Sequence, residues 1–176
     1  IFGASGDLTS RKLMPALYNL AIASLLPAEF AVLGVARHPV SDEEFREGLR
    51  ASTEKYSRTA PLRPLIWESF ASNLYYLSGD YDDPATYEQL RDRLGEIDRK
   101  CGTAGNRLYY LATPPSLVPV IVRHMGEAGL NHGGTPESFA RLVVEKPFGR
   151  DLASARELHR QLWQSFNEDQ IYRNHH

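Results

Sequence analysis

Two glycines near the start of the chain have the spacing of a loop that can bind a dinucleotide. Gly3 and Gly6 stand in the segment IFGASGDL, residues 1–8, between what we expect to be a strand end and a helix start. Backbone N–H groups in such a turn can approach a pyrophosphate, and the dipole of the following helix favours its negative charge. The pattern is G-x-x-G and not the longer G-x-G-x-x-G, so a tight strand-to-helix turn without a ligand is the alternative.

A basic residue follows the second apolar run. Val35 and Ala36 lead directly to Arg37 and then His38. In dinucleotide-binding folds this position contacts the adenosine ribose, through a carboxylate in NAD binders and through a basic residue where a 2′-phosphate must be accommodated. A guanidinium binds phosphate with two parallel hydrogen bonds, so Arg37 favours NADP over NAD. An exposed arginine at a strand end, with no ligand, is the alternative.

The elements that must position these residues alternate along the chain. Short apolar runs predict strands buried on both faces, at residues 30–35, 74–77, 108–112 and 142–144. Between them, apolar residues at three- or four-residue spacing predict helices, around residues 13–20, 87–97, 118–125 and 155–166. This alternation predicts an α/β protein with a doubly wound parallel sheet, the Rossmann fold, whose ligands lie outside the carboxyl ends of the strands.

Local signals mark the helix starts. Ser41 with Glu44 forms a capping box, Pro84 suits a first helical turn, and Ser116 is expected to be an N-cap. Pro15 would be costly inside a helix, so a short first turn is expected before a longer helix that starts near Met14. We expect residues 52–64 and 129–136 to be surface connections.

Composition narrows the class of protein. The 176 residues are 42% hydrophobic and can bury one core, and the net charge of -2 argues against nucleic acid as a partner. Cys101 is the only cysteine, which excludes an internal disulfide and fits a reducing, cytoplasmic setting. The longest apolar stretches, such as residues 117–122, are too short to span a membrane. The chain opens at Ile1 with apparent strand residues, so we expect sequence upstream of it.

Five longer motifs resemble one known family. Residues 3–20 (GASGDLTSRKLMPALYNL) resemble the opening of glucose-6-phosphate dehydrogenases, and residues 34–37, 107–115, 141–155 and 168–173 resemble later motifs of that family in the same order. The resemblance covers essentially the whole chain. It implies an enzyme that oxidises C1 of glucose 6-phosphate to the lactone and reduces NADP, which is the first step of the pentose phosphate pathway in glucose metabolism.

The resemblance also implies which residues bind the coenzyme. The family's pyrophosphate loop corresponds to residues 3–12, its 2′-phosphate arginine to Arg37, and its strand-end contacts to further residues of this chain. The implied coenzyme-binding residues are Gly3, Ala4, Ser5, Gly6, Asp7, Leu8, Lys12, Arg37, Asp80, Tyr81, Tyr110 and Lys146. Lys146 is implied to contact the sugar substrate as well, although Glu145 and Lys146 could equally be a solvated pair by their residue types alone. The isomer of the Lys146–Pro147 peptide bond is left open.

The chain departs from the family after Arg173. There the family continues with a segment that binds the substrate phosphate and with a second domain that supplies the catalytic histidine and through which the family forms oligomers. Here Asn174, His175 and His176 follow, which we interpret as a tag remnant or chain end, with metal binding by the histidines as the alternative. We therefore expect one NADP-binding domain at residues 1–173, without a second domain, a catalytic residue or a metal site.

Two other functions stay open on this basis. A protein that kept the Rossmann half and lost the rest would be a non-catalytic NADP-binding module. An NADP reductase with another substrate is the third alternative, which the EKPFG motif at residues 145–149 disfavours.

Overall fold

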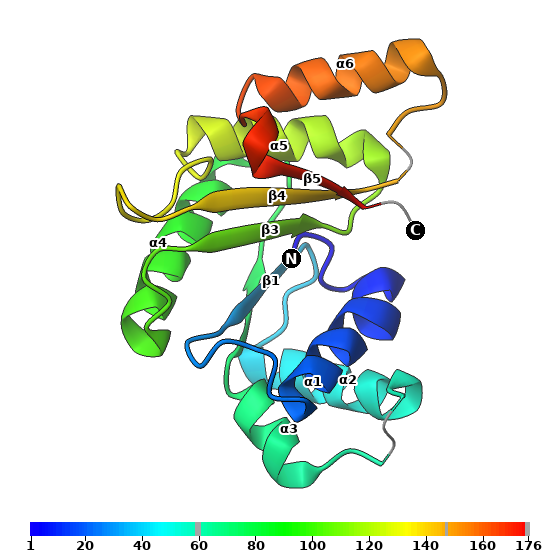
Figure 1. Ribbon diagram of the computed structural model, residues 1–176, viewed down its shortest axis with the longest axis vertical. Helices are drawn as coiled ribbons and strands as arrows, with labels where there is room; N and C mark the ends of the chain where they lie inside the picture. Colours follow the sequence, from blue (N-terminus) through cyan, green and yellow to red (C-terminus); the bar gives the residue numbers. More distant parts are fainter. Residues whose placement is uncertain (59–60, 147, 175–176) are drawn as a thin grey trace.

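The computed structural model of the chain describes residues 1–58, 61–146 and 148–174, in which helices and strands alternate (Figure 1). The strands are β1 (Val32–Ala36), β2 (Leu74–Ser78), β3 (Arg107–Leu111), β4 (Ala140–Glu145) and β5 (Ile171–Asn174). The α-helices are α1 (Met14–Ile22), α2 (Asp42–Tyr56), α3 (Pro64–Ala71), α4 (Pro84–Cys101), α5 (Val118–Glu127) and α6 (Leu152–Trp163). A π-helical turn precedes α1 at Thr9–Leu13, and 3₁₀ turns lie at Pro115–Leu117 and Glu168–Gln170.

All the strand pairs run parallel, and Phe2 joins them at the centre. β1 pairs with β2, and β4 pairs with both β3 and β5. Phe2 bridges Val35 of β1 on one side and Leu111 of β3 on the other. The spatial order is therefore β2–β1–Phe2–β3–β4–β5, which reverses direction at Phe2 and creates a switch point there. This order confirms the predicted doubly wound α/β fold.

Helices cover the two faces of the sheet unequally. One apolar cluster lies under α1, α2 and α3 and includes Tyr18, Trp67 and Phe70. The other lies under α4, α5 and α6 and includes Tyr87 and Leu142. Right-handed crossover connections place their helices on one face of the sheet while the chain moves toward one edge, and on the other face when it moves toward the opposite edge. Because the strand order reverses at Phe2, the two clusters lie on opposite faces.

The expectation that every predicted strand is buried on both faces is wrong for β3 and β4. Buried and more exposed residues alternate along β3 and β4, and Leu108 of β3 is 62% exposed. The reason is topological: α4, α5 and α6 all pack on the same face, whereas α1 to α3 cover β1 and β2 on the other face.

Most of the helix starts agree with the sequence. The capping box of Ser41 and Glu44 is confirmed, Pro84 is the first residue of α4, and α1 begins at Met14. Ser116 is not an N-cap, because it lies inside the 3₁₀ turn and α5 begins two residues later without a side-chain cap.

Two elements were not foreseen. The first is α3, which begins at Pro64, at the end of the stretch 52–64 that was expected to be a surface connection. The last residues of α2, up to Tyr56, also lie in that stretch. The second is strand β5. It pairs with β4, and its register begins with Ile171 opposite Leu142.

The outer edge of β2 is occupied by side chains from α2. Asp42 Oδ1 accepts a hydrogen bond from the Tyr76 amide at 2.7 Å, and Arg46 Nε donates to the Leu74 carbonyl at 2.8 Å. These are main-chain groups that face away from β1, so two polar side chains take the place of a further strand.

Candidate functional site

The glycine loop follows Phe2 and lies beside the carboxyl end of β3. Gly3 has a φ of +85°, and a Cβ atom placed on it would lie 2.4 Å from the Ala112 carbonyl oxygen. The Gly3 carbonyl accepts hydrogen bonds from the Gly6 amide and the Thr9 hydroxyl, each at 3.0 Å. Only glycine permits this approach, so the loop turns at the switch point where dinucleotides bind in such folds.

The first two amides of the loop are already satisfied within the protein. Gly3 and Ala4 both donate to the Val35 carbonyl, at 3.0 and 3.2 Å. Ser5 and Asp7 are exposed, and the helical turn that follows Gly6 presents N–H groups that a helix leaves without internal partners. Main-chain donors to a ligand would therefore come from the residues after Ala4.

The hydroxyl of Tyr81 stabilises the main chain of the glycine loop. Its hydroxyl donates to the Val35 carbonyl at 3.1 Å and lies 3.0 Å from the Gly3 amide, which donates to it. Burial raises the pKa of Tyr81, so the hydroxyl keeps its proton at neutral pH. The sequence implied a coenzyme contact for Tyr81, whereas the structure places its hydroxyl between two main-chain groups of the site.

Two predicted cations lie on elements at this edge. Arg37 directly follows β1, is exposed, and is near enough for its charge to act on the Tyr81 hydroxyl. Lys12 lies in the π-helical turn after the glycine loop and is also exposed. Within the described part of the chain, neither side chain has a carboxylate at ion-pair distance. A 2′-phosphate at Arg37 would therefore not have to displace a carboxylate.

Asp80 organises the turn after β2. Its Oδ1 accepts from the Asp82 amide at 3.0 Å, and its carbonyl accepts from the Thr86 hydroxyl at 2.8 Å. Gly79 is needed here, because a Cβ on it would lie 2.5 Å from Thr86 Oγ1. Sequence reasoning missed Gly79 and Thr86, although a glycine and an aspartate directly after a buried strand are a turn signal.

The ends of β3, β4 and β5 are joined by one side chain. Asn174 Nδ2 lies 3.0 Å from the Tyr110 hydroxyl and 2.9 Å from Glu145 Oε1. Asn174, which was expected to belong to a tag remnant, is the last residue of β5 and pairs with Glu145. Lys146 directly follows β4 and is exposed. Pro147, His175 and His176 lie outside the described residues, so their predictions stay untested.

Thr113 is a residue that sequence reasoning missed. It follows β3 beside the glycine loop, with its Cγ2 3.3 Å from the point where a Cβ on Gly3 would lie. Its buried hydroxyl has no hydrogen-bond partner among the residues that the structure describes. Buried hydroxyls are nearly always bonded, so this one fits a polar group of a ligand at the switch point. The signal in the sequence was its position, directly after the predicted strand at residues 108–112 and before two prolines.

The structure thus brings Gly3, Arg37, Asp80, Tyr110 and Lys146 to the carboxyl edge of one sheet. Among the described residues, no group of three or more His, Cys, Asp and Glu side chains is arranged to hold a metal ion. No helix in the described ranges has the length and apolar character needed to cross a membrane.

Comparisons with known proteins agree with this geometry. The family model described as "Glucose-6-phosphate dehydrogenase, NAD binding domain" matches residues 1–176. The glucose-6-phosphate 1-dehydrogenase of Aggregatibacter actinomycetemcomitans is 47% identical over 173 residues, which cover 98% of this chain and 34% of that protein. The enzyme of the same name from Chlamydia muridarum is 41% identical over 175 residues, with the same coverage of 98% and 34%.

Solved structures give the same result. A glucose-6-phosphate dehydrogenase in complex with its substrate glucose 6-phosphate superposes with a TM-score of 0.86 at 32% identity, over 99% of this chain and 35% of that one. A glucose-6-phosphate 1-dehydrogenase from Mycobacterium avium superposes with a TM-score of 0.79 at 34% identity, over 98% and 35%. The chain spans about a third of the length of the curated relatives it matches. It belongs to the glucose-6-phosphate dehydrogenase family and corresponds to the family's dinucleotide-binding domain.

Proposed function

We propose that this chain is the NADP-binding domain of a longer cytoplasmic enzyme that oxidises C1 of glucose 6-phosphate to 6-phosphogluconolactone. The observation that carries the proposal is the glycine loop at the switch point, with Arg37 beside it and without a competing carboxylate in the described part of the chain. The share of the relatives' length that the chain covers supports a further region that completes the enzyme.

Each residue at the edge has a distinct task in this proposal. Donors that follow Ala4 bind the pyrophosphate, and Arg37 binds the 2′-phosphate that distinguishes NADP from NAD. The unbonded hydroxyl of Thr113 offers a hydrogen bond where the nicotinamide half leaves the loop. NADP held by these residues would supply a nicotinamide ring as the hydride acceptor for C1 of the sugar.

Lys146 is proposed to orient the substrate. It follows β4 at the ligand edge, where its ammonium can donate to a sugar hydroxyl and hold the reacting carbon near the coenzyme. The general base, most of the phosphate-binding groups and the surface for homo-oligomer formation are proposed to belong to the second domain, so the chain alone would bind coenzyme without catalysing the reaction.

Titration and an absorbance assay test the proposal together. Calorimetry should show binding of NADP and weaker binding of NAD by the purified chain. With saturating NADP and glucose 6-phosphate, the chain alone should produce no sustained NADPH absorbance, whereas the full-length enzyme should. Substrate-dependent NADPH formation by the chain alone would contradict the assignment of the base to the second domain, and absence of NADP binding would overturn the coenzyme proposal itself.

A further inference from the structure

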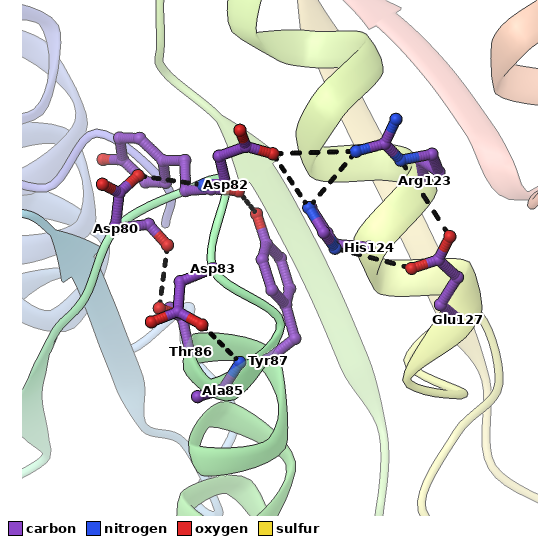
Figure 2. Close-up of polar contacts among 10 residues, drawn as sticks. Asp80, Asp82, Asp83, Ala85, Thr86, Tyr87, Arg123, His124 and Glu127 are labelled. Atoms are coloured by element: carbon purple, nitrogen blue, oxygen red, sulfur yellow. Dashed lines mark hydrogen bonds and ion pairs between the residues drawn. The ribbon is translucent and has the colours of Figure 1, made fainter.

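A buried histidine on α5 contacts the turn that supports the glycine loop. The side chain of His124 is 6% exposed, and its Nε2 lies 3.2 Å from Asp82 Oδ1 (Figure 2). Its Nδ1 lies 3.5 Å from Glu127 Oε2 on the same helix. Arg123 approaches both carboxylates, at 3.6 Å from Asp82 and 4.0 Å from Glu127. The imidazole is thus fixed from both of its nitrogens.

The ring of His124 also stacks on a second buried residue. It lies over the ring of Tyr87 in α4, with centroids 5.0 Å apart and planes 20° from parallel. Tyr87 is fully buried, and its hydroxyl donates to the Tyr81 carbonyl at 2.6 Å. Burial strongly raises the pKa of Tyr87, so its hydroxyl keeps the proton that makes this bond.

These contacts reach the coenzyme edge through Tyr81. Asp82 and Tyr81 are neighbours in the turn after β2, so His124 holds one of them directly and the other through Tyr87. The Tyr81 hydroxyl then contacts the Val35 carbonyl and the Gly3 amide. We call His124, Tyr87 and Tyr81 the aromatic relay. It connects the last turn of α5 to the main chain of the glycine loop.

We propose that His124 is a positioning residue for coenzyme binding, which acts through the aromatic relay to hold Gly3 in the conformation that the loop requires. The inference rests on the proposed coenzyme function. The relay ends on the main chain of Gly3 and Val35, which serves the pyrophosphate half that NAD and NADP share. Loss of the relay should therefore weaken the binding of NAD and of NADP by the same factor, whereas a change at Arg37 should weaken the binding of NADP alone.

Three variants separate the parts of the relay. His124→Phe keeps a ring against Tyr87 and removes both ring nitrogens. Tyr87→Phe removes only the hydroxyl that donates to Tyr81. His124→Gln keeps a nitrogen donor that can reach Asp82, so it serves as the conservative rescue. Calorimetry of the chain should show that the Phe variants raise the Kd of NADP and NAD alike by roughly threefold to tenfold, the equivalent of one hydrogen bond, with His124→Gln closer to wild type.

Two control variants distinguish positioning from lost stability. Arg123→Met removes a second contact to Asp82 and a 3.5 Å contact to His124 Nε2, but keeps the ring stack on Tyr87 and the Tyr87 hydroxyl, so both Kd values should change less than in His124→Phe. Leu162 lies on α6, in the apolar cluster under α4, α5 and α6 that also contains Tyr87. Leu162→Ala creates a cavity there, so it should lower thermal stability without removing any contact of the relay. If Leu162→Ala weakens coenzyme binding as much as His124→Phe does, the positioning role is wrong.

Amide exchange gives a readout that needs no coenzyme. In both Phe variants the Gly3 amide should exchange with solvent at least several-fold faster than in wild type, while amides in β4 stay as they were. Unchanged Gly3 exchange together with unchanged Kd values would overturn the relay. A wild-type chain that binds neither coenzyme would overturn the proposed function instead, and faster exchange at Gly3 would then show that the relay holds the loop for another purpose.

Discussion

The Ala112 carbonyl oxygen and Gly3 are so close that a Cβ atom on Gly3 would lie 2.4 Å from that oxygen. The contact joins the central strand to the end of β3, on the two sides of the switch point. Phe2, which precedes Gly3, holds the two segments together, because its amide donates to the Tyr110 carbonyl and its carbonyl accepts from the Ala112 amide, each at 2.9 Å. Any larger residue at position 3 would lose stability in two separate ways, through steric overlap with the Ala112 carbonyl and through backbone strain at positive φ.

Gly3→Ala should lower the free energy of unfolding by about 2–5 kcal/mol, from a strained left-handed backbone and from overpacking. Two other glycines separate these costs. Gly129 has a φ of +75° and no atom within 4 Å of the point where a methyl group would lie, so Gly129→Ala should cost only about 1–2 kcal/mol. Gly48 has neither restriction and lies inside α2, so Gly48→Ala should stabilise the chain by roughly 0.5–1 kcal/mol. Urea denaturation measures all three, and equal losses at Gly3 and Gly129 would refute the close-contact argument.

Arg37→Ala should weaken NADP binding and leave NAD binding nearly unchanged. A charge-assisted contact to the 2′-phosphate is worth roughly 1.5–3 kcal/mol, which corresponds to about one to two decades in Kd. Calorimetric titration with both coenzymes at fixed ionic strength measures the ratio, because phosphate contacts are screened by salt.

A matched control is available for Arg37. Arg156 on α6 is also exposed, so Arg156→Ala removes the same charge at a different place. It should leave both Kd values unchanged. An unaltered NADP-to-NAD ratio in Arg37→Ala would move the 2′-phosphate site to Lys12 or His38.

Lys146→Ala in the full-length enzyme should lower turnover far more than coenzyme affinity. If the ammonium orients the sugar, its loss should reduce kcat by about 100-fold, while the Kd of NADP should change by less than about threefold. Steady-state kinetics with both ligands and NADP titration give the two numbers. Lys12→Ala is the comparison, because a residue beside the pyrophosphate loop should show the opposite pattern. A loss confined to NADP affinity would make Lys146 a coenzyme contact only.

Protonation of Glu168 at acidic pH should lower the free energy of unfolding. Hydrogen bonds from Arg173 and then from Trp163 lower the pKa of Glu168 from 4.5 to about 2. Because the folded-state pKa is the lower one, the stabilising contribution is complete above pH 4.5 and is lost as the pH falls toward 2. Urea denaturation across this range should therefore show a shallower acid loss for Glu168→Gln than for wild type. Glu43→Gln, on α2, should keep the wild-type slope.

The sequence allowed the fold class to be predicted because buried strands and amphipathic helices have different periods. It could not show that β3 and β4 have one open face, since Leu108 is as apolar as a buried residue and only the topology leaves it exposed. α3 was missed because its eight residues are too few for a clear periodic pattern, although Trp67 and Phe70 pack against Tyr18.

The candidate site was foreseen where chemistry follows from residue type. The turn at Gly3 could be predicted because such a turn needs glycine, and Arg37 stays a predicted phosphate contact because a phosphate attracts a guanidinium. The support beneath them could not, because His124 is distant in sequence from Tyr81 and Tyr87 and meets them only when α5 packs against α4. The roles assigned to the individual coenzyme-binding residues stay predictions.

The polar side chains along β2 have a consequence for how the protein behaves at high concentration. An open strand edge is a template for pairing with another chain, which leads to aggregation or to capture of extended peptides. Here the outward amide of Tyr76 and the outward carbonyl of Leu74 are already bonded to Asp42 and Arg46. An incoming strand would have to break both bonds and displace a carboxylate and a guanidinium, so α2 protects this edge against intermolecular β-sheet formation.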